Sequence, residues 1–283
     1  MPEGPEVQTI VSDLEKTCCF STIIDIQIYP RTKNLLKNTD FEFFKNKVVN
    51  KSITAVTRLG KNIVISLSSG YSLIIHLVMT GQIIIGTSLP KYTRLSLQLD
   101  NKKNIYLADK RTWAQLDLLQ TTEINKQKKF ASLGIDIFSN AFTLENFQSQ
   151  IKGKKAIYTL LLDQRCISGL GNIYVNECLY DACVNPFKTA RDLSNEEVSR
   201  LYFSICAITS QALKYKGSTF SDYRLPSGDI GSYQNHLKIF RKAGLSCQKC
   251  KSIILKRKKT GRSVFYCPVC QDLVPAHPVC YDT

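Results

Sequence analysis

Four cysteines near the end of the sequence have the spacing of a metal site. They form two C-x2-C pairs separated by sixteen residues, at Cys247, Cys250, Cys267 and Cys270. Each pair can present two thiolates to one face of a tetrahedral ion, and the intervening segment is long enough for a β-hairpin. The spacing therefore predicts one structural zinc ion per chain. Because four thiolates leave no open coordination position, we expect this metal to stabilise the fold and not to catalyse.

The first residues, MPEGPEV, offer a second kind of chemistry. An initiator methionine is normally removed before a small residue, which leaves Pro2 with a free secondary amine. An α-amino group titrates at about pH 7.7–8.0, well below a lysine, so a sizeable fraction is nucleophilic at neutral pH. Glu3 stands beside this amine and can act as an acid or a base. If Pro5 starts a helix, Glu6 lies about one turn further, where it can assist the same site or simply complement the helix N-terminus.

The chain is strongly basic. It has 283 residues, with 38 Lys and Arg against 23 Asp and Glu, which gives a net charge of +15. An excess of this size favours a polyanionic partner, most often nucleic acid. The stretch between Asp229 and Asp272 has no acidic residue and ten basic ones: Lys238, Arg241, Lys242, Lys249, Lys251, Lys256, Arg257, Lys258, Lys259 and Arg262. A solvated basic face is the alternative; a lipid surface is disfavoured because the cluster coincides with the cysteine pattern and not with an amphipathic helix.

Composition restricts the class of protein further. With 43% hydrophobic and 22% charged residues, the chain resembles an ordinary globular protein. Its longest apolar stretch, residues 73–85, is too short and too interrupted for a membrane helix, which needs about 20 apolar residues. The first residues lack the basic and apolar regions of a signal peptide. We therefore expect an intracellular, soluble protein with no membrane partner, and we expect it to act as a monomer.

Hydrophobic periodicity predicts a β-rich first half. Apolar residues recur at helical spacing from Val7 to Leu14, after Pro5, which predicts an initial helix. Short runs rich in Ile, Leu, Val and Tyr then alternate with turn signals as far as about residue 119, which favours an antiparallel sandwich or barrel. Strands are expected at residues 23–28, 53–59, 62–67, 72–77, 82–85, 94–99 and 104–107.

A helical period returns after the polar stretch at residues 121–129. Helices are expected at residues 142–151, 156–162, 172–180 and 195–215. The last of these opens on a capping-box arrangement from Ser194 to Glu197. The whole pattern predicts an α+β multidomain protein: a β-rich domain, a helical middle and a zinc ribbon.

Three segments carry a family resemblance: MPEGPEV at residues 1–7, GLGNIY at residues 169–174 and GRSVFYCPVCQ at residues 261–271. Together they resemble the formamidopyrimidine-DNA glycosylase and endonuclease VIII family of base-excision repair enzymes, over nearly the whole chain. The resemblance implies a bifunctional DNA glycosylase and apurinic/apyrimidinic lyase that acts on oxidised bases in damaged double-stranded DNA. It also implies three domains: a catalytic β-sandwich with flanking helices at residues 1–130, a helical domain with a helix–two-turn–helix at residues 131–240, and a zinc ribbon that binds DNA at residues 241–283.

The resemblance assigns catalytic roles to five residues. Pro2 attacks the sugar C1′ as a Schiff-base nucleophile, and the resulting iminium couples base removal to β- and δ-elimination. Glu3 is the catalytic acid and Glu6 a supporting residue. Lys61, on a strand turn, binds a flanking phosphate and assists β-elimination. Arg262 holds the phosphate beside the extruded nucleotide and assists the second elimination.

Further residues are implied to contact DNA. Asn172 follows two glycines at a helix N-terminus, where backbone amides can approach a phosphate. The base must be flipped out of the duplex and the gap filled. Met79 resembles the residue that fills the gap, and His76 a phosphate contact. Arg111 and Trp113 resemble a second intercalating segment. The alternative for Met79, His76 and Trp113 is plain packing in a hydrophobic core.

The sequence leaves the branch of the family to be tested. The stretch at residues 216–235 resembles the loop that caps 8-oxoguanine, and Asp109 beside Arg111 also favours the formamidopyrimidine branch, which takes oxidised purines such as 8-oxoguanine and formamidopyrimidines. Gly4 is more like endonuclease VIII, which would mean oxidised pyrimidines, and Trp113 departs from both patterns. Tyr92 replaces a histidine that usually contacts DNA. A rival from another class is a zinc-ribbon protein that binds damaged DNA without catalysis.

Overall fold

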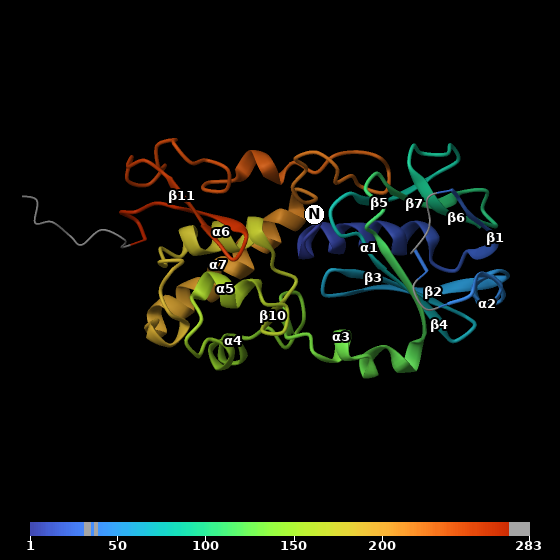
Figure 1. The fold of residues 1–283 in the computed structure, drawn as a ribbon, viewed down its shortest axis with the longest axis horizontal. Helices are drawn as coiled ribbons and strands as arrows, with labels where there is room; N and C mark the ends of the chain where they lie inside the picture. The colour runs from blue at the N-terminus through green and yellow to red at the C-terminus, as the bar shows by residue number, and fades with distance from the viewer. Residues whose placement is uncertain (31–34, 37–38, 272–283) are drawn as a thin grey trace, which may run out of the picture. The chain divides into compact units, whose positions relative to one another are not determined.

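The chain divides into two compact units in the computed structural model, which describes residues 1–30, 35–36 and 39–271 (Figure 1). The first unit comprises Met1–Ser132 and Ala212–Asn235, and the second comprises Leu133–Gln211 and His236–Thr283. Strands dominate the first unit and helices the second, so the expected mixed α+β architecture is confirmed. Within the described part of the chain, no helix has the length and hydrophobicity that a membrane span requires.

An antiparallel sheet of eight strands forms the centre of the first unit, in the order β5-β7-β6-β1-β2-β3-β4-β8. Two residue pairs, Thr22↔Ser52 and Ile23↔Lys51, join β1 to β2. The sheet therefore folds at this narrow junction into two halves of four strands each. The strands are β1 (Thr22–Ile28), β2 (Lys51–Leu59), β3 (Asn62–Leu67), β4 (Tyr71–His76), β5 (Gly81–Gly86), β6 (Thr93–Leu99), β7 (Asn104–Asp109) and β8 (Gln115–Gln120).

Both halves of the sheet share one hydrophobic core with the first helix. Apolar side chains of every strand enter this core, as in a two-layer sandwich. Helix α1 (Gly4–Cys18) lies between the strands of the two halves in Figure 1 and contributes Val7, Ile10 and Leu14, each fully buried. Their helical spacing predicted this helix. The sequence did not reveal α2 (Phe41–Val48), because only Phe44 and Val48 of its eight residues are buried and they form too short a pattern.

Four main helices build the second unit: α4 (Leu144–Gln150), α5 (Ile157–Leu162), α6 (Asn172–Asp181) and α7 (Asn195–Lys214). The capping box expected before α7 is confirmed, since the Glu197 backbone N–H donates to Ser194 Oγ at 3.3 Å and the Ser194 N–H donates to Glu197 Oε2 at 2.7 Å. The second unit also holds the short elements β9 (Ile135–Asp136), β10 (Ile167–Ser168) and η2 (Ala190–Asp192). The first unit holds η1 (Thr121–Lys126) and α3 (Lys128–Ala131), and η3 (Tyr233–His236) begins in the first unit and ends in the second.

A hairpin of β11 (Leu255–Lys259) and β12 (Arg262–Tyr266) packs against helix α6. Asn176 Oδ1, on α6, accepts the Phe265 backbone N–H at 2.6 Å. Glu177, also on α6, accepts the backbone N–H groups of residues 238–240 at 2.8, 3.0 and 2.8 Å. Burial raises the pKa of Glu177, although these three hydrogen bonds favour its charged form. Two neighbouring polar side chains of one helix thus fix both the hairpin and the segment that leads to the cysteines.

Candidate active site and metal centre

Pro2 and Glu3 precede the first helix and are nevertheless buried, as is Glu6 in its first turn. Pro2 is buried, Glu3 is 3% exposed and Glu6 is 1% exposed. Glu3 is the N-cap of α1 and forms a capping box with Glu6, in which Glu6 Oε2 accepts the Glu3 backbone N–H at 2.8 Å. Reciprocal capping satisfies amides that the helix cannot pair internally. The structure therefore buries the Glu3 carboxyl, one residue after Pro2 in the chain, and holds it at the start of α1.

Glu6 connects the amino end to the loop at residues 216–235. Its Oε1 accepts the Ser218 backbone N–H at 2.8 Å. Gly217 has a φ of +79°, and a Cβ there would lie 2.7 Å from Glu6 Oε1, so the contact requires glycine. Burial, and next the Glu6 charge, raise the pKa of Tyr223, whose protonated hydroxyl donates to the Lys216 carbonyl at 3.0 Å.

A hairpin turn places Lys61 near His76. Lys61 follows Gly60 (φ +60°) in the two-residue loop between β2 and β3. Arg58 braces this turn, because its Nη1 donates to the Gly60 carbonyl at 2.7 Å and its Nε donates to Gln8 of α1 at 2.9 Å. His76 ends β4, and its pKa is lowered by burial and then by the charges of Lys61 and Lys129. His76 is therefore neutral at neutral pH.

Met79, Arg111 and Trp113 form one exposed cluster. Met79 is 41% exposed and Trp113 is 50% exposed, so neither belongs to the core. Arg111 lies between them: its Nη1 is 3.8 Å from Met79 Sδ, and its guanidinium carbon is 5.2 Å from the centroid of the Trp113 ring. The two segments that resemble intercalating elements thus present their side chains together.

Asn172 and Arg262 belong to the second unit. Asn172 is the first residue of α6, and its side chain accepts the Tyr158 hydroxyl at 2.5 Å and donates to the Ser263 carbonyl at 3.3 Å. Arg262, which directly precedes Ser263, is the first residue of β12, and its side chain is exposed. Asn172 therefore contacts the hairpin strand that carries Arg262, a role that its sequence motif did not indicate.

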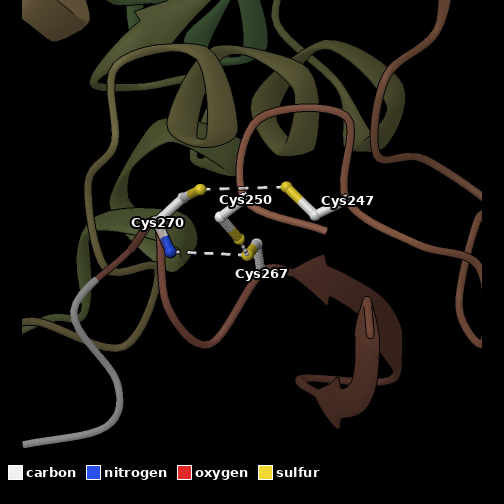
Figure 2. Close-up of side chains that lie close together, drawn as sticks. All are labelled: Cys247, Cys250, Cys267 and Cys270. Carbon is white, nitrogen blue, oxygen red and sulfur yellow. Dashed lines mark hydrogen bonds between the residues drawn. The ribbon is translucent and has the colours of Figure 1, made fainter. Parts of the chain in front are cut away.

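The four cysteines converge as their spacing predicts. Their sulfur atoms all lie within 4.8 Å of one another (Figure 2), and each cysteine is a free thiol. Cys247 Sγ lies 3.7 Å from Cys270 Sγ, and Cys250 Sγ lies 3.3 Å from Cys267 Sγ. Four sulfur donors gathered around one point form a set that can hold a metal ion.

Two exposed lysines of the basic stretch make contacts within the second unit. Lys238 Nζ pairs with Asp181 at 3.2 Å, and Lys249 Nζ donates to the Asp181 carbonyl at 3.0 Å. Lys256, Arg257 and Lys258 of β11 are also exposed. Three consecutive cations of β11 thus add to the positive surface of the hairpin.

The candidate residues fall into the two units. The first unit holds Pro2, Glu3, Glu6, Lys61, His76, Met79, Arg111 and Trp113, and the second holds Asn172, Arg262 and the four cysteines. Sequence reasoning missed the supporting roles of Arg58, Asn176 and Glu177. Their side chains act on residues distant in sequence, and no local pattern announces such contacts.

Two family models match the chain. The model of the formamidopyrimidine-DNA glycosylase N-terminal domain matches residues 1–116, and the model of the formamidopyrimidine-DNA glycosylase H2TH domain matches residues 133–224. Among curated proteins, the chain is 34% identical over 276 residues to the formamidopyrimidine-DNA glycosylase of Desulforamulus reducens, covering 96% of this chain and 99% of the relative.

Solved structures agree with these matches. The MutM (Fpg) protein of Thermus thermophilus superposes with a TM-score of 0.86 at 31% identity, covering 97% of this chain and 100% of that one. The Fpg of Lactococcus lactis, in complex with DNA containing N7-benzyl-Fapy-dG, gives a TM-score of 0.86 at 32% identity, covering 95% and 99%. The same protein is also known in complex with DNA that contains an abasic site.

Proposed function

The chain belongs to the formamidopyrimidine-DNA glycosylase family, and we propose that its buried amino end is the catalytic centre of a DNA glycosylase and abasic-site lyase for oxidised purines. The observation that carries this proposal is the burial of Pro2 and of the adjacent Glu3, with Glu6 linking the Glu3 backbone to the loop at residues 216–235. Relatives bound to formamidopyrimidine and abasic-site DNA support the substrate class.

The chemistry follows from a secondary amine. Once Met1 is removed, the Pro2 nitrogen attacks C1′ of the extruded nucleotide and the bond from C1′ to the base breaks. The sugar ring then opens, O4′ takes up a proton, and the nitrogen lone pair forms an iminium with C1′. The iminium acidifies the C2′ proton. Its removal expels the 3′ phosphate by β-elimination, and a further elimination expels the 5′ phosphate.

Glu3 and Glu6 have different roles in the proposed reaction. Glu3, at 3% exposure, delivers a proton to the departing base or to O4′. Glu6 is a positioning residue, because the backbone N–H groups of Glu3 and Ser218 occupy its two oxygen atoms. Both carboxylates also stabilise the cationic intermediate, and the low exposure of the site strengthens that attraction.

Cationic and polar side chains are proposed to hold the DNA backbone. Lys61 and His76 lie near one another and suit a phosphate beside the lesion. Arg262 extends from the hairpin, and Asn172 begins the helix next to it. Such contacts position the duplex without reading its sequence.

We also propose that the metal held by the four cysteines is zinc. Tetrahedral thiolate coordination is characteristic of structural zinc sites, and bound zinc would lock the two C-x2-C loops together. Cys247 and Cys267 belong to the same buried cluster as Phe265 of β12, so metal binding and hairpin packing support one another. Arg262 would depend on the metal only through this support.

Borohydride trapping tests the nucleophile. Reaction with a duplex that contains one 8-oxoguanine should pass through an iminium, which borohydride reduces to a stable covalent adduct. Peptide mapping should place the DNA on Pro2, and intact mass should show that Met1 is absent from the active protein. An uncleaved tag before Pro2 converts the amine to an amide and should abolish both base excision and strand cleavage.

Three outcomes would contradict the proposal. An adduct on Lys61, or full activity with a blocked N-terminus, would assign the chemistry to another residue. Lys61 would need a strongly lowered pKa to act as a nucleophile, starting from about 10.4. Retention of an abasic-site duplex without nicking would indicate a binding protein. Parallel duplexes with an oxidised pyrimidine test the lesion class, since faster excision there would favour endonuclease VIII-like specificity.

A further inference from the structure

A buried carboxylate connects the two segments that carry the exposed cluster of Met79, Arg111 and Trp113. We propose that Asp109 is a positioning residue that joins these segments into one preorganised insertion element. The inference rests on the proposed function, in which this cluster fills the gap left by the extruded base. In this proposal, Asp109 acts together with Thr80 and Arg94. They hold the three exposed side chains in one fixed arrangement.

The hydrogen bonds of Asp109 reach both segments. Asp109 ends β7 and is 2% exposed. Its Oδ1 accepts the Thr80 hydroxyl at 2.5 Å and the Arg111 backbone N–H at 3.1 Å. Its Oδ2 accepts the Ala114 backbone N–H at 2.7 Å, which closes the loop at residues 110–114. One carboxylate therefore binds the loop at both ends and also binds Thr80, next to Met79.

The Met79 turn is equally constrained. The Gly81 N–H donates to the Leu77 carbonyl at 3.0 Å, and a Cβ on Gly81 would lie 2.5 Å from that oxygen. Gly81, the first residue of β5, pairs with Asp109, the last residue of β7. The turn that precedes β5 and the loop that follows β7 are therefore neighbours at this end of the sheet. The Thr80 hydroxyl also accepts the Arg111 N–H at 3.3 Å. Thr80 is thus the direct link between the two segments.

Arg94 balances the buried charge of Asp109. Its Nη1 lies 3.6 Å from Asp109 Oδ2 and donates to the Ala114 carbonyl at 2.9 Å. Arg94 is 1% exposed, and its Nε and Nη2 have no hydrogen-bond partner among the described residues. A buried guanidinium with unpaired donors is costly. Its hydrogen bond to the Ala114 carbonyl fixes the end of the loop, a contact that simple packing would not require.

Backbone strain points to the same segments. Val78 has a φ of +54° and Thr112 a φ of +60°, so two β-branched residues adopt the left-handed conformation. Such residues rarely do so, and each costs about 1–3 kcal/mol unless the surroundings impose it. One directly precedes Met79 and the other separates Arg111 from Trp113. The hydrogen bonds of Asp109 to Arg111 and Ala114 enclose Thr112, and the Gly81–Leu77 hydrogen bond encloses Val78.

These contacts would give the insertion element a fixed conformation before DNA binds. An insertion element that is ordered before binding loses less conformational entropy when it enters the duplex. Since Arg111 contacts both Met79 and Trp113, the three side chains should enter together. Loss of the Thr80 link should therefore uncouple Met79 from Arg111 without removing either side chain.

Trp113 allows a test on the free protein, because it is the chain's single tryptophan. Thr80→Val removes the hydroxyl with little change in volume. We expect the fast component of the time-resolved fluorescence anisotropy of Trp113 to gain amplitude, and acrylamide quenching to increase. Thr93→Val is the matched control, since Thr93 is 9% exposed and its hydroxyl bonds to the Pro90 carbonyl instead. Unchanged Trp113 mobility in Thr80→Val would overturn the proposal without any reference to catalysis.

A mutant cycle tests the coupling during reaction. In the native background, Met79→Ala and Arg111→Ala should have non-additive effects on excision of 8-oxoguanine. In the Thr80→Val background their effects should become additive, with a loss of coupling of about tenfold. A merely structural role would lower lesion excision and cleavage of a preformed abasic site equally and leave the coupling intact, which would contradict the proposal. If the native protein lacked both activities, the proposed function would fail, while the anisotropy result would still decide whether the hydrogen bond between Thr80 and Asp109 orders the element.

Discussion

At the scale of single residues, Glu3 offers the clearest separation of the two reaction steps. Glu3→Gln preserves the size of the side chain but removes the transferable proton. We expect excision of an oxidised purine to fall by about 10²–10⁴-fold. Cleavage of a preformed abasic site should fall much less, because no departing base needs protonation. Gel assays on both duplexes measure this, with Glu15→Gln on the exposed face of α1 as the control. Equal losses on both substrates would contradict the assignment.

The lowered pKa of His76 predicts how the stability of the folded chain changes with pH. Burial, then Lys61 and Lys129, lower its pKa in the folded chain. The unfolded chain, with a pKa of about 6.5, binds more protons at this position, so stability falls as the pH drops through that value. His76→Gln should remove this term, which amounts to at most about 1.4 kcal/mol per pH unit below 6.5. Urea unfolding at pH 7.5 and 5.5 tests it, and an unchanged pH dependence in the variant would refute it.

At the scale of elements, the contact between α1 and the loop at residues 216–235 can be tested with a second glycine of the same loop as the control. Gly217→Ala places a Cβ 2.7 Å from the Glu6 carboxylate, whereas Gly228, with a φ of +94°, has nothing within 4 Å. Both substitutions strain the backbone, by about 1 kcal/mol. Only Gly217→Ala should also displace Glu6, and it should therefore reduce excision well beyond the effect of Gly228→Ala. Single-turnover rates for the two variants measure the difference; equal rates would mean that the contact is unimportant.

The ribbon gives a prediction about metal removal. Metal analysis should find one zinc per chain, and a strong chelator or Cys267→Ser should release it. The hairpin should then loosen, because Cys267 and Phe265 pack in one cluster, and DNA affinity should fall. Cys19→Ser, outside the cluster, is the control and should retain the metal. Native protein without zinc would contradict this prediction.

Local patterns in the sequence predicted most elements, and long-range contacts explain the rest. A short run rich in Ile and Val located β3 at the residues where the structure has it, and the spacing of Val7, Ile10 and Leu14 located α1. Helix α2 escaped prediction because it buries only two side chains. Motifs indicated Met79 and Arg111 separately. Their meeting depends on Asp109, whose hydrogen bond to Thr80 spans 29 positions and leaves no local signature.

At the scale of the whole molecule, the net charge of +15 has a direct consequence for binding. Cations that neutralise DNA phosphates release counterions, so the logarithm of affinity falls with the logarithm of salt concentration, by about 0.9 per contact. Binding should therefore weaken steeply with salt. The exposed basic side chains of β11 and Arg262 concentrate part of this charge on one hairpin, whereas Lys238 and Lys249 are engaged within their own unit.

Arg262 allows this electrostatic contribution to be measured for one side chain. Arg262→Ala should lower DNA affinity and reduce the salt slope by about 0.9, the value for one lost phosphate contact. The order of preference among damaged bases should not change, because a phosphate contact carries no information on base identity. Fluorescence titrations at several salt concentrations, on duplexes with 8-oxoguanine and with an oxidised pyrimidine, measure both quantities. Lys126→Ala is the control, since this exposed cation already pairs with Glu123 at 2.8 Å and should leave the slope unchanged. A switch in lesion preference at constant affinity would show that Arg262 reads the base and does not hold the backbone.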